Sequence, residues 1–163
     1  MKDSNILRII IGSDHAGFPL KEDVREFLGE MGLEVLDMGA YSDESVDYPD
    51  FGAKVAEKVS SGEFVRGILV CGSGVGMTIV ANKFSGVRAV LCLDSDTACM
   101  SRRHNDTNVL VLAGRRTDIE TAKAIVKTWL ETEFEGERHS RRLNKITDIE
   151  NQYKHSAFSN QQD

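Results

Sequence analysis

A cysteine followed at once by a glycine-rich loop is the segment of this sequence best suited to chemistry. The aliphatic run Ile68–Val70 indicates a buried strand that ends at Cys71, and glycines stand at positions 72, 74 and 76. We expect a helix to open at about Met77, so that several backbone N–H groups converge on one spot beside the cysteine. Such a loop binds negative charge, either a phosphate or an oxyanion that forms during a reaction. The same setting stabilises a thiolate at Cys71.

Two other cysteines, Cys92 and Cys99, lack this setting and fit the ordinary role of a small buried hydrophobic residue. That role also remains an alternative for Cys71. Polar residues follow other predicted strands: Asp14 and His15 after residues 7–11, and Arg115 just past residues 109–113. Asp14 has its own alternative, an ordinary Asx turn.

The elements that must position these residues alternate regularly along the chain. Apolar runs predict strands at 7–11, 33–36, 68–71, 87–93 and 109–113, and helices lie between them, one capped by Asp50 and another by Asp118. The runs are continuous, which is typical of parallel strands buried on both faces. We therefore predict an α/β fold: a three-layer α/β/α, Rossmann-like domain with a five-stranded parallel sheet. Ligands of such sheets bind beyond the carboxyl ends of the strands, where Asp14, Cys71, Asp94 and Arg115 would gather.

Two further groups lie near helix ends. His104 and Asn105 follow the helix predicted at 95–103, where Asn is an ordinary terminator, but an imidazole also moves protons near neutral pH. Arg138 and Arg142 are four apart and share one face of a helix predicted to run to Tyr153. Either that face is simply solvated, or the two guanidinium groups on it bind a phosphate together.

Composition narrows the class of protein. The 163 residues suit one domain, here residues 1–153, with a frayed tail at 154–163. A net charge of -6 argues against nucleic-acid and membrane partners. Three cysteines without framework spacing favour free thiols, and the first residues resemble no signal peptide, so we expect a cytoplasmic protein.

A dinucleotide-binding enzyme is the main rival. The glycines after the strand and Asp94 after the next resemble its fingerprint, but the third glycine comes one residue early for G-x-G-x-x-G. No Gly-Lys-Ser/Thr follows, which excludes a P-loop. A non-catalytic nucleotide-binding module also stays open.

A known family carries the same motifs in the same order. Its members share segments that match residues 12–18, 47–49, 71–76, 81–83, 104–106 and 138–142 here, including Asp14-His15, Asp47-Tyr48-Pro49 and His104-Asn105-Asp106. From about Ile6 to Tyr153 the chain resembles the sugar-phosphate isomerase family that includes type B ribose-5-phosphate isomerases and the subunits of galactose-6-phosphate isomerase. Ser73 stands where many members have Thr, and no acid lies at 75–79, where members without the cysteine use a glutamate.

This resemblance implies an isomerase that interconverts ribose 5-phosphate and ribulose 5-phosphate without metal or organic cofactor. It implies that Cys71 is the base, that His104 assists ring opening, and that Asp14 holds sugar hydroxyls. The loop Gly72, Ser73, Gly74, Val75 and Gly76 would stabilise an enediolate. The remaining substrate contacts would come from Tyr48, Asn105, His15, Arg115, Arg138 and Arg142.

The resemblance also implies a homodimer whose subunits share active sites, with the C-terminal arginines donated by the neighbour. The sequence leaves dimer or tetramer open. It also leaves open whether ribose 5-phosphate is preferred over allose 6-phosphate or another hexose phosphate.

Overall fold

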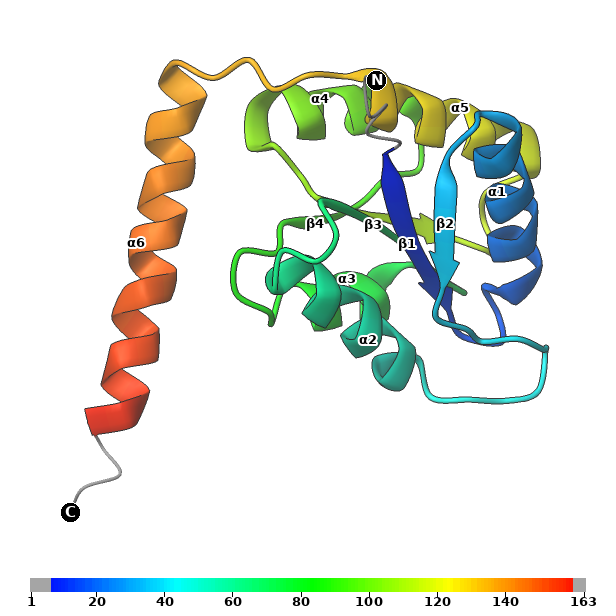
Figure 1. Cartoon of the computed structure of the whole chain (residues 1–163), viewed down its shortest axis with the longest axis horizontal. Coiled ribbons are helices and arrows are strands. Elements are labelled where there is room, and N and C mark those ends of the chain that lie inside the picture. Colours follow the sequence, from blue (N-terminus) through cyan, green and yellow to red (C-terminus); the bar gives the residue numbers. More distant parts are fainter. Residues whose placement is uncertain (1–6, 160–163) are drawn as a thin grey trace, which may run out of the picture.

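Five parallel strands form the centre of the molecule, in the order β2-β1-β3-β5-β4 (Figure 1). The computed structural model describes residues 7–159, with side chains up to Tyr153. The strands are β1 (Arg8–Ser13), β2 (Glu34–Asp37), β3 (Arg66–Cys71), β4 (Ala89–Leu91) and β5 (Val109–Ala113). The predicted α/β architecture is thereby confirmed.

Helices cover both faces of the sheet. Helices α1 (Phe18–Glu30), α4 (Ser95–Asn105) and α5 (Ile119–Glu131) enclose one core with the strands, and Trp129 is its largest fully buried side chain. Helices α2 (Tyr48–Ser60) and α3 (Val75–Ala81) enclose the other core, which includes Cys71. Side chains alternate between faces along each strand, so β3 contributes Ile68 and Val70 to the first core and Leu69 and Cys71 to the second.

Register places the ends of the central strands side by side. Ser13 pairs with Val70 across β1 and β3, and Cys71 pairs with Ala113 across β3 and β5. The residues that directly follow these strands therefore meet at one edge of the sheet. The chain turns to opposite sides of the sheet after β1 and β3, which is where open α/β sheets bind ligands.

Two expected element boundaries differ from the observed ones. Helix α2 begins at Tyr48, and Asp50 lies in its first turn, so the prediction that Asp50 caps this helix is wrong. Pro49 fixes a helical φ at the first turn and so allows the earlier start. Strand β4 is only Ala89–Leu91, because it lies at the sheet edge, where one side has no neighbour to pair with. The predicted cap Asp118 is confirmed: its side chain accepts a hydrogen bond from the Thr121 amide.

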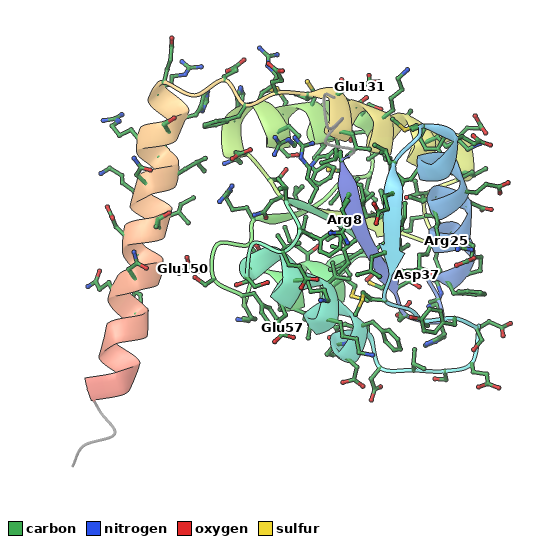
Figure 2. The ribbon with its side chains drawn as sticks, viewed as in Figure 1. Arg8, Arg25, Asp37, Glu57, Glu131 and Glu150 are labelled. Atoms are coloured by element: carbon green, nitrogen blue, oxygen red, sulfur yellow. The ribbon has the colours of Figure 1, made fainter. Side chains whose placement is uncertain are left out.

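The last helix, α6 (Arg138–Ser159), stands apart from the body of the domain (Figure 1). The extended segment 132–136 leads to it. Glu150, labelled in Figure 2, points from α6 toward the body and accepts hydrogen bonds from the Gly86 amide at 3.0 and 3.1 Å. The sequence predicts a frayed tail at 154–163; residues 154–159 belong to α6, and residues 160–163 lie outside the described part of the chain.

No helix among residues 7–159 is both long enough and apolar enough to cross a lipid bilayer.

Candidate active site

A cleft of about 270 Å³ opens where β1, β3 and β5 end. It is formed by the residues that follow these strands and by the first residue of α2. Its lining consists of Asp14, His15, Ala16, Tyr48, Cys71, Gly72, Ser73, Gly76 and Arg115. The structure thus brings together most of the residues predicted from the ends of the strands.

Cys71 lies at the base of this cleft and is 4% exposed. Its sulfur accepts a hydrogen bond from the backbone amide of Gly74 at 3.2 Å. Gly74 has φ of 78°, in the left-handed region that glycine adopts without strain, and this turn points its amide back at the sulfur. An N–H group aimed at the thiol stabilises negative charge on it.

Two other glycines of the loop allow side chains to lie directly against it. A Cβ at Gly76 would lie 2.7 Å from the ring of Tyr48, and one at Gly72 would lie 3.4 Å from Cδ of Arg115. Arg115 is also fixed through its backbone, because its amide donates to the Gly72 carbonyl at 3.0 Å. The phenol ring and the guanidinium group therefore flank the loop from two sides.

Asp14 and His15 form the opposite wall. Asp14 is 7% exposed, and its Oδ1 accepts from the Gly17 amide at 2.8 Å, which is the Asx turn considered above. Its other carboxylate oxygen has no hydrogen-bond partner within the described chain, so the turn leaves one oxygen for a ligand hydroxyl. His15 contacts the backbone of Val46 through Nδ1 at 3.2 Å, which ties it to the loop before α2. Ser73 accepts from the Val75 amide at 3.3 Å and is exposed at the mouth of the cleft.

Asp94 does not belong to this cleft. It caps α4 by accepting from the Thr97 amide at 2.7 Å, and this hydrogen bond lowers the pKa of the Asp94 carboxyl. Strand β4 lies at the outer edge of the sheet, and Asp94, three residues past its end, does not line the Cys71 cleft. The resemblance of this aspartate to a ribose-binding acid is therefore incidental.

His104, Asn105, Arg138 and Arg142 do not line the Cys71 cleft of the same chain. They lie at the end of α4 and the start of α6. Helices run opposite to the strands they follow, so the end of α4 lies at the amino edge of the sheet. At this edge, Arg88 lies just before β4, and its Nε donates to the carbonyl of Asn105 at 3.0 Å. One chain therefore holds two separate groups of the predicted residues.

The second group contains two residues to which sequence reasoning assigned no role: Glu135, and His139 of the matched segment 138–142. The rings of His104 and His139 stack with centroids 4.3 Å apart and planes at 10°. Oε2 of Glu135 lies 3.7 Å from Nε2 of His104 and 3.4 Å from Nε2 of His139. Glu135 is itself held by Arg103, whose Nε donates to Oε1 at 2.7 Å, and this bond lowers the pKa of the Glu135 carboxyl. The carboxylate therefore stays ionised beside the two imidazoles.

His139 is 4% exposed, and its environment disfavours a second charge. Burial lowers the pKa of His139, and the neighbouring His104 and Arg138 lower it further. Arg138 Nε approaches Nε2 of His139 at 3.4 Å. Only the spacing of Arg138, His139 and Arg142 on one helix could have indicated this cluster from sequence.

The same three side chains are the candidate metal ligands of the described chain. One ligand atom each from His104, Glu135 and His139 lies within 4.8 Å of the others. Arg103 already neutralises the carboxylate, however, and Arg138 approaches one imidazole. A divalent cation would enter a site that already carries excess positive charge, whereas an anion would be attracted to it.

Comparisons with known proteins are consistent with this geometry. Residues 9–146 match the family model described as Ribose/Galactose Isomerase. The chain is 49% identical over 143 residues to ribose-5-phosphate isomerase B of Escherichia coli (strain K12), covering 88% of this chain and 96% of that protein.

Two solved structures are similar over nearly their whole length. Ribose-5-phosphate isomerase B of Clostridium thermocellum has a TM-score of 0.88 and 52% identity, covering 90% of this chain and 99% of that one. The Mycoplasma genitalium enzyme with bound ribulose-5-phosphate has a TM-score of 0.85 and 41% identity, covering 89% and 97%. The chain belongs to the ribose/galactose isomerase family.

Proposed function

We propose that this protein is an isomerase that interconverts D-ribose 5-phosphate and D-ribulose 5-phosphate, with Cys71 as the proton-transferring base. The observation that carries the proposal is the Cys71 thiol, which receives the Gly74 N–H at 3.2 Å in a cleft that also holds Asp14, His15 and Arg115. The cleft therefore combines a base, an anion-stabilising loop and cations suited to a phosphate. Proton abstraction beside a carbonyl needs the first two within reach of one carbon.

The chemistry proceeds on the open-chain sugar. The Cys71 thiolate removes the C2 proton of the aldose, and the electron pair moves to form the C1–C2 double bond of an enediolate. Free N–H groups of the loop and the Ser73 hydroxyl stabilise the developing charge on oxygen. Cys71 then returns its proton to C1, the proton of the C2 hydroxyl passes to the C1 oxygen, and the C2 oxygen becomes the ketone, so no redox partner is consumed. Asp14 holds sugar hydroxyls through its unpaired oxygen, and Tyr48 closes the side of the pocket.

The phosphate would lie between His15 and Arg115 on one side and Arg138 and Arg142 on the other. Because the last two arginines lie away from the Cys71 cleft of their own chain, we propose that they come from a second subunit. His104 and Asn105 would enter the same shared site. Helix α6 stands apart from its own domain and exposes Ile146 and Ile149, at 51% and 56%, which supports a role between subunits (Figure 1).

We place the protein in the cytoplasm, because all three cysteines are free and Cys71 must remain reduced to act as a base. In solution, we expect helix α6 to lie between two copies of this chain.

Incubating the purified protein with ribose 5-phosphate alone and measuring ketose formation tests the function. Nucleotide binding without isomerisation would instead support a binding module, and a nicotinamide-dependent absorbance change would support a dehydrogenase. Allose 6-phosphate, assayed in parallel, measures how strictly the pocket selects a five-carbon sugar.

A further inference from the structure

A second cleft, of about 270 Å³, lies at the amino edge of the sheet, away from the Cys71 cleft. Three arginines from different elements line it: Arg66 begins β3, Arg88 precedes β4, and Arg102 lies in the last turn of α4. The remaining lining residues are Val59, Gly62, Phe64, Val65, Asp106 and Asn108. None of the residues assigned to substrate lines this cleft.

The charges in this cleft do not balance. Asp106 is its one carboxylate, and it accepts from Arg102 Nη1 at 2.8 Å and from Arg88 Nη2 at 3.1 Å. Three guanidinium groups against one carboxylate leave two positive charges in excess. The chain as a whole carries -6, so this local excess runs against its overall charge.

Arg66 has no carboxylate partner within residues 7–153. Its Nη1 donates to the carbonyls of Trp129 and Leu130 at 3.1 and 3.2 Å, at the end of α5. Burial, and then repulsion from Arg102, lowers the pKa of Arg66 to about 10. The charged form of Arg66 is unfavourable in this partly buried position, and a bound anion would stabilise it.

Donors remain for such an anion. A guanidinium group has five N–H donors. In the described chain, the Nε and Nη2 groups of Arg66, the Nη1 group of Arg88 and the Nη2 group of Arg102 make no hydrogen bond. Planar guanidinium groups with paired N–H donors match the oxygens of a phosphate.

We propose that the cleft between Arg66, Arg88 and Arg102 is a second anion site, which binds a phosphate group, either free or as a sugar's monoester. The volume accommodates a tetrahedral oxyanion with a small substituent. The proposal stands whether or not the proposed function is correct, because it concerns binding at residues that the isomerisation does not use.

The same contacts connect this site to the turn that ends α4. Arg88 donates to the carbonyls of Asn105 and Asp106, each at 3.0 Å from its Nε, and Arg102 Nη1 donates to the Thr107 carbonyl. An anion that competes with Asp106 for these guanidinium groups loosens the turn that carries His104 and Asn105. Only this effect on turnover depends on the proposed function.

The test is a titration of the full wild-type chain, labelled with ¹⁵N in its arginines and backbone amides, followed by NMR. Sodium phosphate is added in one arm, ribose 5-phosphate in a second, and sodium chloride at matched ionic strength in a third. The Arg66 and Arg88 side-chain signals report the second cleft, and the Arg115 signal reports the Cys71 cleft in the same spectrum. Arg25, half exposed and paired with Glu22 at 2.6 Å, is the control for general screening.

We expect the Arg66 and Arg88 signals to shift saturably with phosphate but not with chloride, and the Asn105 and Asp106 amides to shift with them. If phosphate and ribose 5-phosphate reach half-saturation at the same concentration, the free oxyanion is sufficient for binding. If ribose 5-phosphate reaches half-saturation at a lower concentration, the site also contacts the sugar. A response confined to Arg115, or parallel linear shifts that include Arg25, would overturn the proposal. Arg66→Gln should raise the half-saturation concentration about tenfold or more through loss of charge-assisted hydrogen bonds, while Arg25→Gln should leave it unchanged. If Arg66→Gln does not fold, Arg88→Gln takes its place.

Discussion

The backbone amide of Gly74 lies 3.2 Å from the sulfur of Cys71 and donates to it. The contact depends on a backbone conformation, φ of 78°, that side chains rarely adopt. A Cβ at this position would also lie 2.4 Å from Cδ1 of Leu91. Glycine at position 74 therefore allows the left-handed turn and, through that turn, places its amide against the thiol.

Gly74→Ala should lower both activity and stability. The left-handed backbone costs a non-glycine residue about 1–3 kcal/mol, and a backbone that relaxes from this φ would turn the amide away from Cys71. We expect kcat/KM to fall about tenfold or more with loss of one charge-assisted hydrogen bond at the base. Steady-state kinetics and urea unfolding measure the two effects.

Gly29→Ala is the matched control. Gly29 lies in α1, and a Cβ there meets no atom within 4 Å. This change should leave kcat/KM unaltered and raise stability by up to about 1 kcal/mol, the helix-propensity difference. Equal losses in the two variants would show that the Gly74 effect is not specific to the loop.

Sequence reasoning correctly grouped Cys71, Asp14, His15 and Arg115 in one cleft, because each lies at or just past the end of a parallel strand and parallel strands share one carboxyl edge. Sequence reasoning failed for Asp94 because local sequence patterns do not determine the order of strands in a sheet, and β4 lies at the outer edge. It did not find Glu135, whose role depends on tertiary contacts with Arg103, His104 and His139. The cap at Asp118 was recognisable because capping is local, whereas Pro49 moved the start of α2 ahead of Asp50.

The pKa of His139 makes stability depend on pH. Burial, His104 and Arg138 lower it below the ordinary value, so the unfolded chain binds this proton more readily than the folded chain does. Stability therefore rises with pH through the ordinary histidine range, around pH 6.5. As the pH falls from about 7.5 to about 5.5, we expect the free energy of unfolding to decrease less in His139→Gln than in wild type. Urea unfolding at several pH values measures this, and identical pH profiles would show that His139 is not responsible.

Two inactive variants should restore activity when mixed. Arg138→Ala and Cys71→Ala should each be inactive alone, because every shared site of a homodimer lacks one group. In mixed dimers, one site combines Cys71 from one chain with Arg138 from the other. About a quarter of all sites are then intact in an equal mixture with full exchange. Exchange proven by mass spectrometry without recovered activity would place Arg138 in its own subunit's site or outside it.

His104→Asn should separate ring opening from isomerisation. Ring opening removes a proton from the anomeric hydroxyl and delivers one to the ring oxygen, which suits an imidazole because its ring nitrogens can accept and donate protons. We expect severe loss of turnover from cyclic ribose 5-phosphate. The reverse reaction should be largely spared when the open aldehyde is trapped chemically. Equal loss in both directions would assign His104 a binding or structural role instead.

The most direct test of the account is the rate at which Cys71→Ala converts ribose 5-phosphate to ribulose 5-phosphate, compared with Cys92→Ala. Loss of a general base costs about 10²-fold or more, so Cys71→Ala should retain less than about a hundredth of wild-type turnover in both directions, with its fold and substrate binding intact. Cys92, fully buried in the other core, should be dispensable for turnover. Cys71→Ala activity above about a tenth of wild type, too small a loss for a missing general base, would contradict the assignment of Cys71 as the base.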